Sequence, residues 1–439
     1  MGSEWATGWL TRAKGATPTP RLSARQLPHL VERDEIAAWL RLTLTPGIGN
    51  ISARKLLAAF GLPQSIFEQP AKALKQVVSA LQAQALGTEP EELAALTDVT
   101  WAWLQQDTAQ GIRRQVATLG DPRYPQALLN LDDPPLMLYL MGNASYQQKN
   151  ALAPADGVLA ATDSIASWPV IDTTSSLAMV GSRNPTPQGA ANARRFAKSF
   201  AQAGLTVVSG MALGIDGAAH EGALESISAS HQAVTVAVVG TGLDRVYPKA
   251  HHDLAHRIAL NGLLVSEYPL GTPPLNANFP KRNRLIAALA QGTLVVEAAL
   301  KSGSLITARL TAEQGREVFA IPGSIHAAQS RGCHALIKQG AKLVESAQDV
   351  LEELSWPGRL PHAPDIEAAS TDPERAEGIF YQDTQLVNAL GFDPVSFEAL
   401  QARTGLETAD LQAQLMGLEL DGLVARLPGG LFQRQRPEV

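Results

Sequence analysis

The sequence predicts an α/β protein in which a Rossmann-like parallel sheet domain lies between an N-terminal helical domain and a C-terminal winged-helix module. Short apolar runs rich in β-branched residues recur along the middle of the chain, and a helical pattern follows each one. The runs are LAMVG, LTVVSG, TVAVVG, LLVSEY, TLVVEAAL and EVFAIPG. Near-continuous apolar strands that alternate with helices indicate a parallel sheet covered on both faces. We therefore predict a Rossmann-like domain at residues 177–355.

The composition is that of a folded protein with several domains. The chain has 439 residues, of which 45% are hydrophobic and 18% are charged, and this length corresponds to roughly two to four domains. The net charge of −6 excludes a histone-like protein coated in basic residues, but a local basic patch would still bind phosphates. The lone cysteine, Cys333, excludes an intramolecular disulfide framework and favours a reducing compartment. Because we find neither a signal peptide nor a membrane-spanning apolar run, we expect a cytoplasmic protein with no membrane partner.

The N-terminal third is predicted to be helical. Residues 1–34 carry scattered Thr, Pro, Ser and Arg and are expected to form a flexible extension. From 35 to 120 apolar residues recur at helical spacing, with Gly or Pro at the joints, which indicates a SAM-like or helix-hairpin-helix-like domain. Within it, Thr45–Gly49 (TPGIG) resembles a helix-hairpin-helix turn, whose backbone amides can hold a DNA phosphate. A plain connector between two helices fits this turn equally well.

The other segments are connectors and a C-terminal module. Residues 121–176 are predicted to form a proline-rich connector that ends in a strand, followed by an insertion of low periodicity. The Pro- and acid-rich stretch 356–378 is predicted to be a linker. Residues 379–436 show three helical patterns and then a hairpin with Pro-Gly-Gly at its turn, which is typical of a winged helix.

Three glycine-containing turns are predicted to meet at one edge of the sheet. They are Gly181, Ser182 and Arg183 after the first strand, Ser209, Gly210 and Met211 after the second, and Gly240–Gly242 after the third. Ligands of open α/β sheets bind outside the carboxyl ends of the strands, where glycines permit close approach and helix N-termini attract phosphate. Each turn taken alone is also explained by the ordinary need for Gly and Ser at strand-to-helix turns. The three together favour a binding rim.

A basic and aromatic segment opens the helix after the fourth strand. Its residues are Asn278, Phe279, Pro280, Lys281, Arg282, Asn283 and Arg284. Lys and Arg neutralise phosphates, and an exposed Phe offers a face on which a base can stack, a combination that suits a single strand better than a duplex. The alternative is a solvated helix start in which Phe279 belongs to the core. Lys249 is expected to add another cation to the rim.

The sequence gives little support for an enzyme. The dinucleotide signature G-x-G-x-x-G is absent after the first strand, where the chain has GSRNPTPQG. Glu297, at the end of the fifth strand, is interpreted as a structural or hydrogen-bonding carboxylate rather than a catalytic one. Cys333 and His334 lack an orienting third group, and the nine histidines show no metal spacing. We expect no catalytic residue, no cofactor and no metal.

Long ordered blocks of the sequence resemble the DprA/Smf (DNA-processing protein A) family. The blocks include GSRNPTPQG, VVSGMALGIDGAAH, VVGTGLDRVYP, NFPKRNRLIAAL and SRGCHALIKQGAKLV, and the similarity runs almost unbroken from 177 to 354. The resemblance implies a homodimeric protein that binds and protects single-stranded DNA and helps to load a RecA-type recombinase during natural transformation. The family's binding rim, transferred to this chain, comprises Gly181, Ser182, Arg183, Ser209, Gly210, Met211, Lys249, Phe279, Lys281, Arg282 and Arg284; Asn278 joins them as the first residue of the basic segment.

Two other functional classes remain open at this point. The fold and the segment Gly292–Glu297 are similar to lysine-decarboxylase-like phosphoribohydrolases, although this chain lacks the glycine pair of their Pro-Gly-Gly-x-Gly-Thr-x-x-Glu motif. A winged-helix regulator of duplex DNA is the third class. Its recognition helix would be Thr408–Asp421, which has no Lys or Arg and is flanked by Glu407. Because an acidic helix is repelled by phosphates, we predict that this module is not the main DNA-binding element and instead contacts protein or its own α/β domain.

Overall fold

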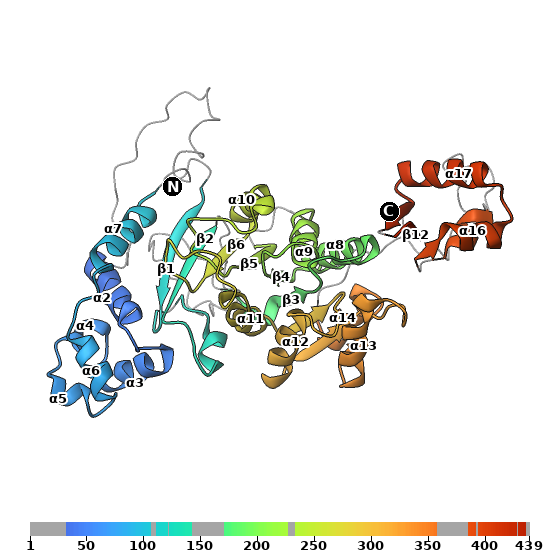
Figure 1. Ribbon diagram of the computed structural model, residues 1–439. Coiled ribbons are helices and arrows are strands. Elements are labelled where there is room, and N and C mark those ends of the chain that lie inside the picture. The colour runs from blue at the N-terminus through green and yellow to red at the C-terminus, as the bar shows by residue number, and fades with distance from the viewer. Residues whose placement is uncertain are drawn as a thin grey trace, which may run out of the picture.

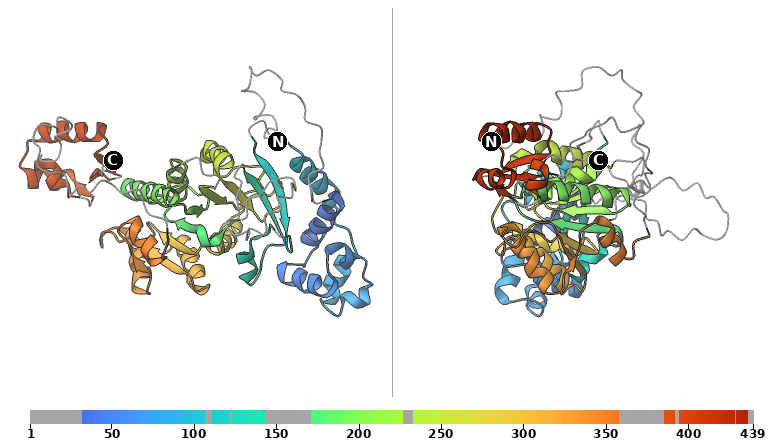
Figure 2. Two further views of the ribbon diagram at one scale, coloured as in Figure 1. Left: turned by 180° about the vertical axis from the view of Figure 1, so that it is seen from behind. Right: turned by 90° about the vertical axis from the view of Figure 1, so that its right-hand side faces the viewer.

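A computed structural model describes residues 32–106, 111–121, 123–142, 171–226, 233–357, 385–391, 394–427 and 429–435. Figures 1 and 2 show the α/β domain in the middle of the molecule, the helical domain at one end and the C-terminal module at the other. The predicted extension 1–34 and linker 356–378 lie almost entirely outside the described residues, as does most of the predicted insertion. Among the described helices, none is long and apolar enough to cross a membrane.

The central sheet has nine described strands, in the order β1-β2-β6-β5-β4-β3-β7-β8-β9. Their bounds are Arg113–Thr118 (β1), Met137–Gly142 (β2), Ser176–Val180 (β3), Thr206–Ser209 (β4), Thr235–Val238 (β5), Leu263–Ser266 (β6), Gly292–Val295 (β7), Glu317–Ala320 (β8) and Lys342–Leu343 (β9). The pairs from β6 to β9 are all parallel. This confirms the predicted Rossmann-like sheet, whose apolar runs form strands that are buried on both faces.

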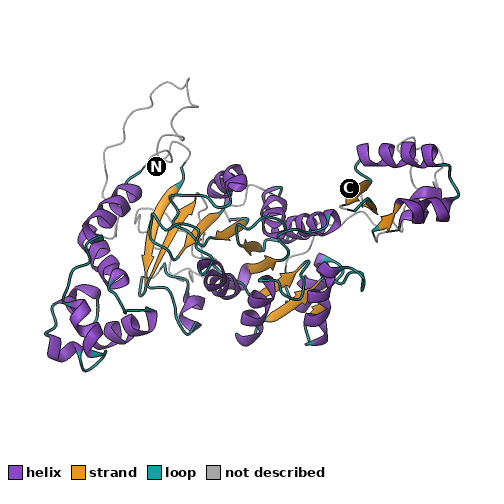
Figure 3. Cartoon of the chain, viewed as in Figure 1, coloured by secondary structure: helices purple, strands orange, loops and turns teal. Residues whose placement is uncertain are grey.

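Helices cover both faces of this sheet (Figure 3). Phe196 and Phe200 of α8 (Pro187–Gln202) pack with α9 (Ile215–Leu224) and α14 (Ala347–Glu353) in one apolar core. A second core, on the other face, takes in α11 (Asn278–Ala288), α12 (Ser304–Glu313) and α13 (Arg331–Lys338). The remaining helix, α10 (His252–Asn261), contacts β2 and β6.

The sheet extends further towards the N-terminus than the sequence indicates. Strand β2 pairs antiparallel with β6, with Tyr139 opposite Ser266, and β1 pairs antiparallel with β2. Strand β1 therefore lies inside the range expected to be helical, and the expected connector contributes β2 to the sheet. The segment RRQVAT has no clear strand pattern of its own, so its conformation is set by pairing with β2 rather than by local propensity.

The helical domain shares a core with the sheet. Its helices are α2 (Arg33–Leu44), α3 (Asn50–Phe60), α4 (Pro63–Phe67), α5 (Ala71–Leu74), α6 (Ala80–Leu86) and α7 (Leu93–Leu104). Trp39 belongs to the core of the helical domain and is 1% exposed. The rings of Trp103 and Tyr139 meet edge to face with centroids 5.9 Å apart, so α7 packs directly on β2. A fragment that begins at residue 177 would therefore lose β2, one of the two partner strands of β6, together with this packing.

The C-terminal module has the predicted winged-helix composition. Its helices are α15 (Gln385–Leu390), α16 (Phe397–Thr404) and α17 (Thr408–Leu420), and its strands are β10 (Val395–Ser396), β11 (Val424–Leu427) and β12 (Leu431–Arg434). The strands form a separate sheet in the order β10-β12-β11. Leu400, Leu411 and Leu415 belong to an apolar core within this module.

The strand order creates a switch point between β3 and β7. From β3 the chain proceeds through β4 and β5 to β6 on one side, and it then crosses over to β7, β8 and β9 on the other. Helices that follow β3 and β7 leave the sheet on opposite faces, which opens a crevice at the carboxyl ends of these strands.

Candidate nucleic-acid interface

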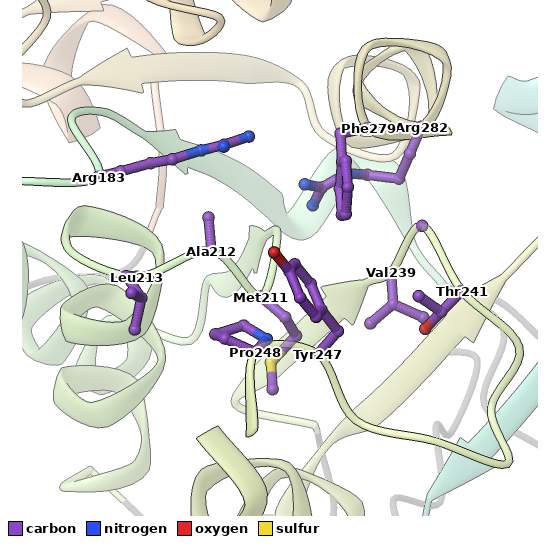
Figure 4. A pocket seen from close by; sticks show the side chains of 11 residues that line it. Arg183, Met211, Ala212, Leu213, Val239, Thr241, Tyr247, Pro248, Phe279 and Arg282 are labelled. Carbon is purple, nitrogen blue, oxygen red and sulfur yellow. The ribbon is translucent and has the colours of Figure 1, made fainter. Parts of the chain in front are cut away.

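Two adjoining cavities lie at the carboxyl ends of the strands. The first, which we call the aromatic pocket, is lined by Arg183, Met211, Ala212, Leu213, Val239, Gly240, Thr241, Tyr247, Pro248, Phe279 and Arg282 (Figure 4). The second, which we call the switch-point groove, has a volume of about 500 Å³ and extends from Gly181 and Ser182 to Lys301, Ser302 and Ser304. Arg183, Phe279 and Arg282 border both cavities, so the two form one continuous surface.

The loop between β3 and α8 forms one wall of the groove. A Cβ atom on Gly181 would lie 2.6 Å from Cγ1 of Ile215, so only glycine fits there. The Ser182 hydroxyl accepts a hydrogen bond from the backbone N–H of Asn184 at 3.1 Å, which shapes the turn. The Arg183 side chain is exposed and extends towards the cavities (Figure 4).

Glu297 holds the start of α8 rather than lining either cavity. Its carboxylate accepts hydrogen bonds from the Thr186 backbone N–H at 2.9 Å and from the Thr186 hydroxyl at 2.5 Å. Thr186 in turn caps α8 by accepting from the N–H of Gly189. Burial raises the pKa of Glu297, and the hydrogen bonds from Thr186 oppose that shift. These contacts agree with the structural role expected for this carboxylate.

The loop between β4 and α9 is held in place by hydrogen bonds to its backbone carbonyls. Two histidines donate hydrogen bonds to it: His220 Nε2 to the Gly210 carbonyl at 2.5 Å and His251 Nδ1 to the Met211 carbonyl at 3.0 Å. The Ser209 hydroxyl donates to the Met179 carbonyl at 2.6 Å and is fully buried. Burial lowers the pKa of His220 to about 4, so this ring is neutral near pH 7. Of the three predicted rim residues here, Met211 is the one whose side chain lines a cavity.

Phe279 is positioned by the residue before it. Asn278 is buried, and its side-chain amide donates to the Gly240 carbonyl at 3.0 Å, which joins the start of α11 to the loop after β5. The Phe279 ring lies 5.6 Å from the Tyr247 ring, and the Arg183 guanidinium lies 5.8 Å from the Phe279 centroid. Phe279 is half-buried at the cavities and is not part of the core. An aromatic pair and a cation therefore border one opening.

Arg282 forms the floor between the two cavities. It is 4% exposed, and its guanidinium donates to the Val238 carbonyl at 2.7 Å. Asp216 is the charged group that attracts it most strongly: burial raises the pKa of Asp216 and lowers the pKa of Arg282, and the attraction between them opposes both shifts. A Cβ atom on Gly210 would overlap the Arg282 guanidinium, so a glycine is required where these two charges meet. Among the described residues, Arg282 Nε has no hydrogen-bond partner.

The structure does not bring Arg284 into the rim. Arg284 is 7% exposed and forms an ion pair with the buried Glu267, and its Nε lies 3.4 Å from Asp133. Arg284 follows Arg282 by two residues, which places it about 200° around α11 and therefore away from the cavities that Phe279 and Arg282 line. The sequence suggested an unpaired cation because no acid occurs within the segment 278–284; the acid comes instead from the end of β6. Burial raises the pKa of Glu267, and Arg284 counters this shift.

The other two predicted cations are exposed beside the cavities rather than within their linings. The Lys281 ammonium lies 6.0 Å from the Tyr268 ring centroid. Lys249 is exposed in the short 3₁₀ helix Lys249–His251, directly after Pro248 of the aromatic pocket.

Sequence reasoning missed two parts of the site. Tyr247 comes from the loop after β5, and only its ring contact with Phe279 in three dimensions shows its place. Lys301, exposed in the turn just before α12, lines the groove with Ser302 and Ser304. The sequence Ser302-Gly303-Ser304 was a usable signal, since such residues are common where a helix N-terminus receives an anion. Within the described ranges, no three His, Cys, Asp or Glu side chains are grouped closely enough to hold a metal ion.

The fold and the site define a class: a Rossmann-like protein with a cationic and aromatic surface at its switch point, linked to a winged helix. Residues 167–355 match the family model of DNA recombination-mediator protein A, and residues 368–430 match that of the DprA winged helix domain. Protein Smf of Escherichia coli is 43% identical over 265 residues, which cover 59% of this chain and 68% of the relative. Protein Smf of Synechocystis is 30% identical over 429 residues, which cover 91% of this chain and 99% of the relative.

A solved structure agrees with these matches. DNA processing protein A (DprA) from Streptococcus pneumoniae superposes with a TM-score of 0.56 at 33% sequence identity, covering 74% of this chain and 98% of that one. The chain belongs to the DprA/Smf family of DNA-processing proteins.

Removing the buried Arg284 should destabilise the protein more than removing its exposed neighbour on α11. Arg284→Ala leaves the Glu267 carboxylate buried without its partner, and breaking such a pair costs about 3–5 kcal/mol. Lys281→Ala loses one exposed cation–π contact, worth about 0.5–1 kcal/mol. Chemical denaturation of both variants measures the difference. Equal free energies of unfolding would contradict the structural assignment of Arg284.

Proposed function

We propose that the aromatic pocket and the switch-point groove together bind single-stranded DNA. The observation that carries this proposal is the convergence of the Phe279 ring with the Arg183 guanidinium at 5.8 Å, at the opening shared by both cavities. A base can stack on the ring while the cation neutralises the neighbouring phosphate. Aromatic stacking beside a cationic groove is the general mode by which proteins hold single strands without reading their sequence.

Local charge supports the proposal although the whole chain is acidic. The net charge is −6, yet three cations, Arg183, Arg282 and Lys301, line the groove. The N-terminus of α12 also opens onto the groove through Ser302 and Ser304. Backbone N–H groups at a helix N-terminus favour an anion, so phosphates receive both charge and hydrogen bonds there.

The proposal involves no catalytic step. In the phosphoribohydrolase alternative, Glu297 would have to reach a bound nucleotide. Its carboxylate instead accepts two hydrogen bonds from Thr186 and does not line either cavity. Incubation with adenosine monophosphate and an assay for free adenine provide a direct check, because release of adenine would favour that enzyme class.

The full-length chain should bind a single strand more tightly than a duplex of equal length. Phe279 can stack on an unpaired base, whereas the bases of a duplex are already stacked on one another. Titration of labelled oligo-dT and of the matching duplex, at several salt concentrations, measures this preference. A preference for duplex would refute the stacking site. The whole chain is used because a fragment of residues 177–355 lacks β1 and β2.

Two variants locate the strand in that experiment. Arg183→Ala should weaken binding and reduce the slope of log K against log salt by about 0.7, the contribution of one single-strand phosphate contact. Phe279→Ala should weaken binding with little change in slope, because loss of stacking releases no counterions. Arg257→Ala is the matched control, since Arg257 is exposed on α10 and lines neither cavity. Equal effects of Arg183→Ala and Arg257→Ala would place the DNA elsewhere.

We further propose the cellular role that family membership suggests: a cytoplasmic homodimer that protects single-stranded DNA and helps to load a RecA-type recombinase on it during transformation and recombination. With DNA coated by a single-strand-binding protein, the full-length chain should raise the DNA-dependent ATPase rate of the recombinase several-fold. Arg183→Ala should lose this effect, since a mediator must hold the strand. An unchanged rate in the presence of wild-type protein would refute the loading role. Light scattering should give twice the mass of one chain if the homodimer forms.

The winged-helix module should contribute little DNA binding. Helix α17 carries Asp410 and Glu419 and has no Lys or Arg, so its charge repels phosphates. In the wing, the Arg426 guanidinium lies 5.7 Å from the centroid of the Phe432 ring. We expect residues 376–439, which have their own core, to show feeble and salt-sensitive gel shifts. Tight binding of this fragment to duplex at physiological salt would instead support the regulator hypothesis.

A further inference from the structure

Tyr247 occupies the mouth of the aromatic pocket beside Phe279. The two residues come from different elements, Tyr247 from the loop after β5 and Phe279 from the start of α11. Their ring centroids lie 5.6 Å apart, and their planes are tilted by 36° (Figure 4). They therefore form a continuous aromatic wall that has two differently oriented faces.

The position of Tyr247 is unlike that of the core tyrosines. Tyr124 and Tyr139 are each 1% exposed and pack inside the protein. Tyr247 is 48% exposed, although it lines the pocket together with apolar residues such as Met211 and Val239. A large ring that is half in solvent, at the edge of an apolar pocket, stabilises the fold less than a buried one would. Its free area is instead available to a ligand with a flat apolar face.

We propose that Tyr247 is a second base-stacking residue, so that the site holds two successive bases of a strand, one on Phe279 and one on Tyr247. This inference rests on the proposed single-strand binding. A single base cannot lie parallel to both rings, because their planes differ by 36°. Adjacent bases of an unpaired strand can adopt different orientations, since no complementary strand holds them parallel.

The polar groups around the wall favour stacking over reading of base edges. The Gly240 carbonyl accepts from Asn278, and the Thr241 carbonyl accepts from Ser266 at 2.6 Å. The Arg282 guanidinium donates through one terminal nitrogen to the Val238 carbonyl, while its buried Nε has no partner among the described residues. Because both carbonyls of the loop already accept hydrogen bonds, few acceptors remain to distinguish one base from another. The two-ring wall should therefore accept any base sequence.

The test compares two ligands that have the same phosphates: a dT 12-mer and a 12-mer of abasic residues. Tyr247→Ala in the full-length chain should lower affinity for the dT 12-mer roughly tenfold, the usual loss for one stacked base. It should leave the salt slope and the affinity for the abasic 12-mer unchanged. Tyr247→Phe should retain wild-type affinity, because the ring is preserved. Ile325→Ala is the control, since Ile325 is 72% exposed and lines neither cavity.

A second variant reports stacking directly and does not depend on a loss of affinity. Tyr247→Trp places an indole at the same position, and its fluorescence should be quenched by the dT 12-mer but not by the abasic 12-mer. If Phe279→Ala weakens dT binding while Tyr247→Ala does not, and no added quenching occurs, Tyr247 has no stacking role and the single-strand site still stands. If wild-type protein binds neither 12-mer, the proposed function itself fails.

Discussion

The buried charge of Arg282 is the constraint on which the proposed binding surface depends. Its guanidinium is held by the Val238 carbonyl at the end of β5 and is attracted by Asp216 at the start of α9. Three elements thereby acquire fixed positions relative to one another: β5, α9 and α11. A buried cation is stable only with such partners. Because the Arg282 guanidinium lies against Gly210, a side chain at position 210 would overlap it. Two histidines hold the same loop by hydrogen bonds to its backbone carbonyls.

Much of the architecture could be predicted because it is encoded locally. Apolar runs such as LAMVG and TVAVVG are sufficient to indicate parallel strands, and three helices followed by a Pro-Gly-Gly hairpin indicate a winged helix. Strand β1 was not predicted, because RRQVAT becomes a strand only through its pairing with β2. The family resemblance correctly indicated the DprA/Smf family, which the sequence matches independently support.

The candidate site was predicted less completely because its residues are joined by tertiary contacts. Gly181 and Arg183 lie directly after β3, so their place at the carboxyl edge of the sheet could be anticipated from the sheet alone. The partner of Arg284 could not be anticipated in this way, because Glu267 lies 17 residues earlier, directly after β6. Tyr247 was likewise invisible, because nothing in its neighbourhood in sequence indicates that its loop folds back against α11.

The Arg284 cluster also determines how the helical domain can move. Arg284 is paired with Asp133, whose backbone carbonyl accepts a hydrogen bond from Asn50 at the start of α3, while Arg54 donates to the adjacent Asp132 carbonyl. The helical domain is thus fastened to the same helix that carries Phe279, as well as to β2 through Trp103. To swing away it would have to break the hydrogen bonds from Asn50 and Arg54 and open the apolar core that it shares with the sheet. The domain is therefore a fixed wall of the molecule and not a hinged lid.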